Sequence, residues 1–256
     1  MNTVFKTRHT HGRWNMAALG VAALLAFLMI WLNACSSVST GAKTSKAATS
    51  TTSTQSARPG SAHAAVSADE IVPASLSAAG EYGENVYDHA KANDWKNADV
   101  KLAALRDAVK KVRTDVKNKS AAVDRIDGHV ASLDRAVTAK DRQAAMREAN
   151  QVTLDVADMT TAYKLSVPVE VTKLDYYGRE LEVWAQAQDA SKLQGTAREM
   201  RRTWASLRPS VEAHATEAKK FDALVAQVES AKTPADYTRV ATHVLTEVDN
   251  LEKLFH

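Results

Sequence analysis

The sequence predicts an all-α protein in which two antiparallel four-helix bundles follow one another along the chain. The 256 residues include only 9 Gly and 5 Pro, too few for an all-β fold, which needs a turn about every 8–12 residues. Beyond residue 77 the apolar residues recur at alternating spacings of three and four, which is typical of a packed helix. The single Cys excludes a disulfide framework and a cysteine-based zinc site.

Eight apolar stripes follow one another in this part of the chain, and each predicts one helix. They span residues 79–89, 95–116, 123–137, 145–163, 174–184, 193–211, 221–231 and 237–255. Asp94 and Asp141 stand where N-caps are expected, and Thr233 with Pro234 forms a cap followed by Pro at the first helical position. The gaps between stripes are short, which favours antiparallel neighbours in up-down-up-down bundles.

The eight helices resemble four helices written twice. A shift of 95 residues places the stripe at 79–89 on that at 174–184, with Tyr82-Gly83 on Tyr177-Gly178. Chance alignment is the alternative, because helical periods align easily. We interpret the match as a duplication, because Gly inside a helix costs about 1 kcal/mol relative to Ala and is unlikely to recur by accident. The two units span residues 78–165 and 166–256.

Residues 1–34 have the pattern of a signal peptide. Three basic residues and no acid precede an apolar run at 16–32, which is typical of a secretory signal. The tetrapeptide Leu32-Asn33-Ala34-Cys35 resembles a bacterial lipobox, although Asn33 differs from the usual small or apolar residue. The resemblance implies cleavage before Cys35 and acylation of this residue, which would anchor the protein to a membrane through two or more acyl chains. The alternative is an uncleaved signal anchor with an incidental Cys.

Residues 35–77 are predicted to be the lipidated Cys35 and a disordered tether. Of the 42 residues after Cys35, 26 are Ser, Thr or Ala, so the segment cannot bury enough apolar surface to fold. Ser36 follows the cysteine where an Asp would indicate retention at the inner membrane. We therefore expect a lipid-anchored envelope protein, on the outer membrane and facing the periplasm if the cell is Gram-negative.

Each helical unit also resembles the periplasmic b-type cytochromes that fold as one four-helix bundle. The resemblance is carried by the runs that begin at Asn93-Asp94 and at Ala187-Gln188-Asp189, and by the acids Asp141 and Asp236 near the starts of the fourth helices. That family holds haem between a Met early in its first helix and a His late in its last. Neither unit has this pair, so the resemblance implies the fold without the haem.

Few residues in the helical region indicate chemistry. His89 lies on an otherwise apolar stripe, where it is a weak metal-ligand candidate or, alternatively, a hydrogen-bonded bundle histidine. We find no Glu-x-x-His pair, no phosphate-binding loop and no Gly-x-Ser-x-Gly, so we expect no catalytic residue, no cofactor and no enzyme activity. Three basic pairs are interleaved with acids and are interpreted as solvated surface rather than an anion site. They are Lys110-Lys111, Arg201-Arg202 and Lys219-Lys220.

The net charge gives no support to nucleic-acid binding. The formal charge of +3 resides in the predicted signal peptide, which carries three bases and no acid, so the mature chain would have 30 of each. We expect a non-enzymatic helical binding or scaffold module with an unidentified protein partner. The alternatives are a haem- or metal-binding carrier with a cytochrome-like bundle, and a periplasmic chaperone or stress adaptor.

Overall fold

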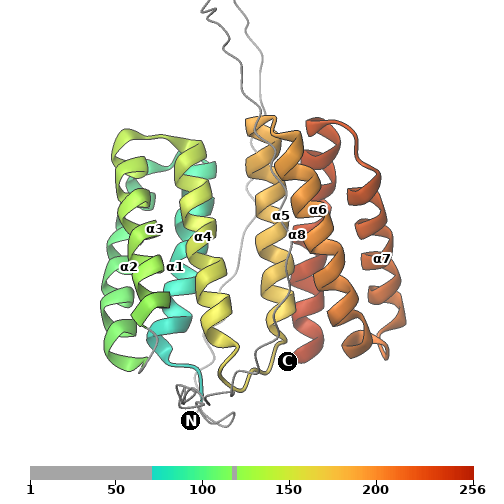
Figure 1. Cartoon of the computed structure of the whole chain (residues 1–256), viewed down its shortest axis with the longest axis horizontal. Helices are drawn as coiled ribbons and strands as arrows, with labels where there is room; N and C mark the ends of the chain where they lie inside the picture. The colour runs from blue at the N-terminus through green and yellow to red at the C-terminus, as the bar shows by residue number, and fades with distance from the viewer. Residues whose placement is uncertain (1–70, 117–119) are drawn as a thin grey trace, which may run out of the picture. The chain divides into compact units, whose positions relative to one another are not determined.

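The computed structural model describes residues 71–116 and 120–256, and this part of the chain is all-helical with no strand. The predicted signal peptide, the lipobox and most of the tether lie outside the described residues. The described residues form eight α-helices, two of which are followed by a short 3₁₀ turn (Figure 1). Their bounds are α1 (Ala74–Lys91), α2 (Trp95–Asp115), α3 (Ser120–Ala139), α4 (Arg142–Thr160), α5 (Val169–Ala187), α6 (Ala190–Leu207), η1 (Arg208–Val211), α7 (Ala215–Ser230), α8 (Pro234–Glu252) and η2 (Lys253–Phe255).

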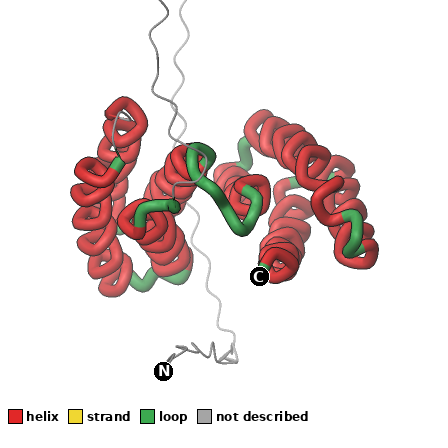
Figure 2. The backbone as a smooth tube through the Cα atoms, turned by 90° about the horizontal axis from the view of Figure 1, so that it is seen from below, coloured by secondary structure: helices red, strands yellow, loops and turns green. Residues whose placement is uncertain are grey.

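The eight helices form two four-helix bundles, α1–α4 and α5–α8, as predicted (Figures 1 and 2). In each bundle the first helix packs against the second and the fourth, and the third packs against the fourth. Each bundle has its own cluster of buried apolar side chains. The short loops make consecutive helices antiparallel neighbours, and burial of their apolar stripes against one another produces a bundle.

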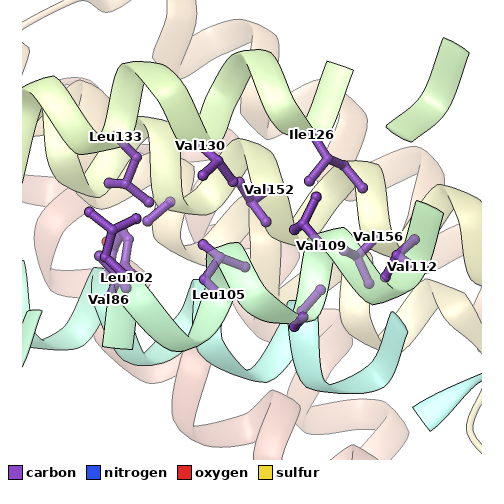
Figure 3. Close-up of a cluster of buried hydrophobic side chains, with 14 of the residues drawn as sticks. Val86, Leu102, Leu105, Val109, Val112, Ile126, Val130, Leu133, Val152 and Val156 are labelled. Atoms are coloured by element: carbon purple, nitrogen blue, oxygen red, sulfur yellow. The ribbon is translucent and has the colours of Figure 1, made fainter. Parts of the chain in front are cut away.

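The core of the first bundle is made by the predicted stripes. Figure 3 shows Leu102, Leu105 and Val109 of α2 pointing toward Ile126 and Leu133 of α3. None of these five side chains is more than 2% exposed. The core of the second bundle contains the largest buried side chain, Trp204 of α6, whose ring centroid lies 4.6 Å from that of Phe221. Both cores are therefore apolar and close-packed.

Three of the connections between helices have the same two-residue turn. It is formed by residues 93–94, 140–141 and 188–189. The first residue of each pair, Asn93, Lys140 or Gln188, has φ of 55–56°, the left-handed conformation that ends a helix. The second residue is an Asp whose carboxylate accepts a hydrogen bond from the backbone N–H three residues on. The N-caps predicted at Asp94 and Asp141 are confirmed, and Thr233 caps α8 in a capping box with Asp236.

The boundary expected at residue 78 falls inside α1, which begins at Ala74. The Ser and Ala composition of residues 74–77 predicts tether, but Leu76 is fully buried in the first core. The Ser75 hydroxyl also donates to Asp115 at 2.6 Å. Burial of Leu76 and the hydrogen bond from Ser75 to Asp115 stabilise the first turn of α1. The composition of this segment does not indicate either contact.

The two bundles place equivalent residues in equivalent roles at the shift of 95. Gly83 lies against Ala149 of α4, and Gly178 lies against Val244 of α8. The glycine in the first helix of each bundle allows a close approach of the fourth helix at the same position. The left-handed residues Asn93 and Gln188 are also 95 apart. These structural equivalences favour the duplication.

The two glycines at positions 178 and 195 predict opposite responses to alanine. A Cβ on Gly178 would lie 2.7 Å from Leu245 Cδ2 and 3.0 Å from its Cγ, whereas a Cβ on Gly195 meets nothing within 4 Å. We expect Gly178→Ala to lower the free energy of unfolding by about 1 kcal/mol, because Leu245 must leave its position. Gly195→Ala should raise it by up to about 1 kcal/mol through helix propensity. Urea unfolding of both variants measures this, and equal shifts would contradict the close approach at Gly178.

Candidate functional site: a buried polar cluster between the bundles

Helix α5 is covered on two sides, because it packs against α6 and α8 of its own bundle and against α4 of the first. One turn of this helix carries three charged side chains that are almost fully buried. Arg179 is 9% exposed, and Glu180 and Glu182 are each 6% exposed. Charged groups are almost never buried unless they are paired, so their partners define the contact between the bundles. We call these three residues, with Tyr87, Lys91, Asn150, Gln151 and Tyr176, the interbundle cluster.

Glu182 is paired with helix α1. The Tyr87 hydroxyl donates to its Oε2 at 2.9 Å, and Lys91 Nζ lies 2.7 and 2.6 Å from its two carboxylate oxygens. Burial raises the pKa of the Tyr87 phenol, and the negative charge of Glu182 raises it further. Tyr87 is therefore a hydrogen-bond donor at neutral pH, and Lys91 neutralises the buried carboxylate.

Glu180 is paired with helix α4. Asn150 Nδ2 donates to the Tyr176 carbonyl at 3.1 Å and to Glu180 Oε1 at 3.5 Å, and Gln151 Nε2 donates to the Tyr176 hydroxyl at 2.8 Å. The Trp184 indole N–H also donates to Glu180. Burial raises the pKa of Glu180 despite these donors, which favour the ionised form. The backbone and side chains of α5 are thus fixed to α4 by directional contacts.

Arg179 bridges the two bundles near one end of the cluster. Its Nε lies 2.9 Å from Asp175 Oδ2 on its own helix, and its Nη2 lies 3.5 Å from Glu84 Oε2 on α1. The guanidinium also lies 5.1 Å from the centroid of the Tyr87 ring, within the range of a cation–π contact. The Nη1 atom is buried and has no hydrogen bond. One cation therefore serves carboxylates from both bundles.

A cavity of about 190 Å³ lies beside Arg179, between α1, α5 and α8. Its charged lining is strongly acidic, with Glu84, Asp175, Asp249 and Glu252 against the single Arg179. Burial raises the pKa of Glu84 to about 7, and the charges of Asp175, Asp88 and Glu252 add to the rise while Arg179 opposes it. Burial also raises the pKa of Asp175. We call this feature the acidic cavity.

A second set of polar side chains connects α3 to α4 within the first bundle. His129 Nδ1 lies 2.9 Å from Glu148 Oε2, and its Nε2 lies 3.7 Å from Asp155 Oδ2. Arg125 Nε donates to the other carboxylate oxygen of Asp155 at 3.0 Å. These contacts connect the mostly buried carboxylates of α4 to His129 and Arg125 of α3 and hold the two helices together.

The sequence-predicted site residues are not brought together. His89 lies at the end of α1 with Nδ1 3.3 Å from Asp94 Oδ2, so it contacts the N-cap of the next helix. Among residues 71–116 and 120–256, no group of three or more His, Cys, Asp and Glu side chains has a geometry that could hold a metal ion. Cys35 lies outside the described residues. The basic pairs at 110–111, 201–202 and 219–220 are exposed, as predicted.

No sequence motif marks the interbundle cluster, although α5 carries a signal for it. Its large apolar residues are not confined to one stripe, because Tyr176 and Val183 lie off the stripe formed by Leu174, Tyr177, Leu181 and Trp184, and both are buried. A helix that is apolar on more than one face is covered on more than one side. This pattern indicates a second packing surface on α5, but not which charged side chains it encloses.

Comparisons with known proteins add no relative. No protein-family model, curated protein sequence or solved structure matches the chain. Among the helices that the structure describes, none combines the length and apolar character needed to cross a bilayer.

The pairing of Arg179 predicts a large and pH-dependent effect of its removal. We expect Arg179→Gln to lower the free energy of unfolding by about 2 kcal/mol at pH 8, because it leaves carboxylates of both bundles without their cation. The loss should be smaller at pH 5, where Glu84 and Asp175 take up protons more readily once Arg179 is absent. Urea unfolding at both pH values measures the difference.

Arg202→Gln is the matched control for this experiment. Arg202 is also paired with a carboxylate, that of Glu199, but its side chain is 72% exposed. Exposed pairs contribute about 0–1 kcal/mol, so this variant should unfold nearly as the parent does at both pH values. If Arg179→Gln lowered the free energy of unfolding as little as Arg202→Gln does, the interpretation of Arg179 as a buried cation that joins the two bundles would be contradicted.

Proposed function

We propose that the protein is a membrane-anchored envelope lipoprotein whose helical body acts as a non-enzymatic binding or scaffold module. The observation that carries the proposal is the tetrapeptide Leu32-Asn33-Ala34-Cys35, which follows a basic and apolar leader and precedes a long Ser, Thr and Ala segment. An acyl-modified Cys35 would hold the body at the membrane, and two or more acyl chains are needed for stable anchoring.

The geometry of the helical body supports the scaffold part of the proposal. Paired charges and directional hydrogen bonds hold α5 against both α1 and α4. Hydrogen bonds between charged groups are shorter and stronger than neutral ones and restrict orientation. A partner that contacts both bundles would therefore meet surfaces with a defined relative geometry, which lowers the entropic cost of binding.

Cys35 gives the direct test of anchoring. Cys35→Ser removes the thiol that would carry the diacylglyceryl group, so metabolic labelling with palmitate should disappear and the protein should leave the membrane fraction. Ser36→Ala changes the neighbouring side chain but keeps the thiol, and it should label as the parent does. Palmitate incorporation into Cys35→Ser would show that the lipobox interpretation is wrong.

Partner binding is tested by photo-crosslinking in whole cells. We would place a photoreactive amino acid at Ala103 of α2 and, separately, at Ala226 of α7, which are exposed positions on the two bundles. We expect a discrete adduct with an envelope protein from at least one position, and a weaker adduct when Cys35→Ser releases the chain from the membrane. The absence of any discrete adduct from both positions would count against the binding role.

A further inference from the structure

Charged and hydrogen-bonding side chains of α5 make many of the contacts between the bundles. From α5, Val183 belongs to the core of the first bundle and Trp184 packs against it. Hydrogen bonds and ion pairs to the first bundle are made by Lys173, Tyr176, Arg179, Glu180 and Glu182. The covalent link is the single connection at residues 161–168. A change in charge at the contact therefore alters the docking free energy.

Glu84 faces more carboxylates than cations. Asp88 lies one turn further along its own helix, Asp175 and Arg179 face it from α5, and Asp249 and Glu252 line the same cavity from α8. Arg179 is shared with Asp175, and the nearby Lys91 is engaged by Glu182. An ionised Glu84 therefore meets four other carboxylates with only part of one cation to offset them.

We propose that the acidic cavity makes docking of the two bundles pH-dependent: the bundles are held together while Glu84 carries its proton and are loosened once Glu84 ionises. The first physical cause is that docking removes the Glu84 carboxylate from water, and the second is repulsion from the neighbouring carboxylates, which Arg179 only partly offsets. Separation of the bundles would return Glu84 to water, where its charge is well solvated. The inference is independent of membrane anchoring.

The pH range follows from the pKa of Glu84, which is about 7 in the docked protein and 4.5 in water. Because docking raises the pKa, its stabilising contribution is fully present below pH 4.5 and is lost as the pH rises through 7. The Glu84 side chain is 39% exposed, so water screens part of the repulsion between Glu84 and the neighbouring carboxylates. We therefore expect the equilibrium constant for opening to increase about tenfold between pH 5.5 and 8.5.

Thiol protection in the full chain can measure this opening. Val183 is 1% exposed at the contact between the bundles, so Val183→Cys in a Cys35→Ser background places a reactive thiol there. The rate of alkylation, divided at each pH by that of an exposed thiol introduced by Ala103→Cys, reports the opening equilibrium. We expect the normalised rate to rise about tenfold from pH 5.5 to 8.5, and Glu84→Gln to make it nearly independent of pH.

Two controls separate opening of the contact from other events. Glu81→Gln removes a carboxylate from the exposed face of the same helix and should leave the pH dependence unchanged. Ala98→Cys places a thiol in the core of the first bundle, where Ala98 is fully buried, and it should stay protected at pH 8.5. Equal protection of the thiol at position 183 at both pH values, a pH dependence that persists in Glu84→Gln, or parallel exposure of the thiol at position 98 would each overturn the proposal.

Discussion

The covering of α5 on two sides is the constraint on which the arrangement of the bundles depends. A helix at the edge of a four-helix bundle would expose its charged residues, but α5 encloses Arg179, Glu180 and Glu182. Each of these groups must find a partner, because a buried charge without one is costly. Helix α1 supplies Tyr87 and Lys91, and helix α4 supplies Asn150 and Gln151. The positions of α1 and α4 relative to α5 are therefore set by the need to satisfy these groups.

Helix periodicity made most of the fold predictable. The stripes, caps and short loops are local features, and each acts within a few residues of the chain, so the eight helices and the caps at Asp94, Asp141 and Thr233 follow from the sequence. The start of α1 was predicted four residues too late because its first turn depends on Leu76, an apolar residue among Ser and Ala, and on a hydrogen bond from Ser75 to Asp115. Such a contact joins residues that no local pattern connects.

The interbundle cluster was unpredictable for the same reason on a larger scale. Its pairs join residues about 25–95 positions apart, such as Asn150 with Tyr176 and Tyr87 with Glu182. Which face of α5 meets α1 depends on the rotation of one whole bundle against the other. In the sequence, Arg179 and Glu182 resemble the solvated charges of any bundle helix. His89 is the opposite case, since it stands on an apolar stripe but lies beside the carboxylate of an exposed N-cap, Asp94.

The spacing of the two central pairs has an evolutionary consequence. Glu84 with Arg179 and Tyr87 with Glu182 are each 95 residues apart, the offset of the internal repeat, so equivalent positions of the two bundles face each other. In a symmetric dimer of a single ancestral bundle, each of these positions would face its own copy, and an acid would meet an acid. Fusion of the two copies into one chain lets the positions mutate separately. The complementary pairs seen here therefore require two copies that differ in sequence, so two identical subunits could not form them.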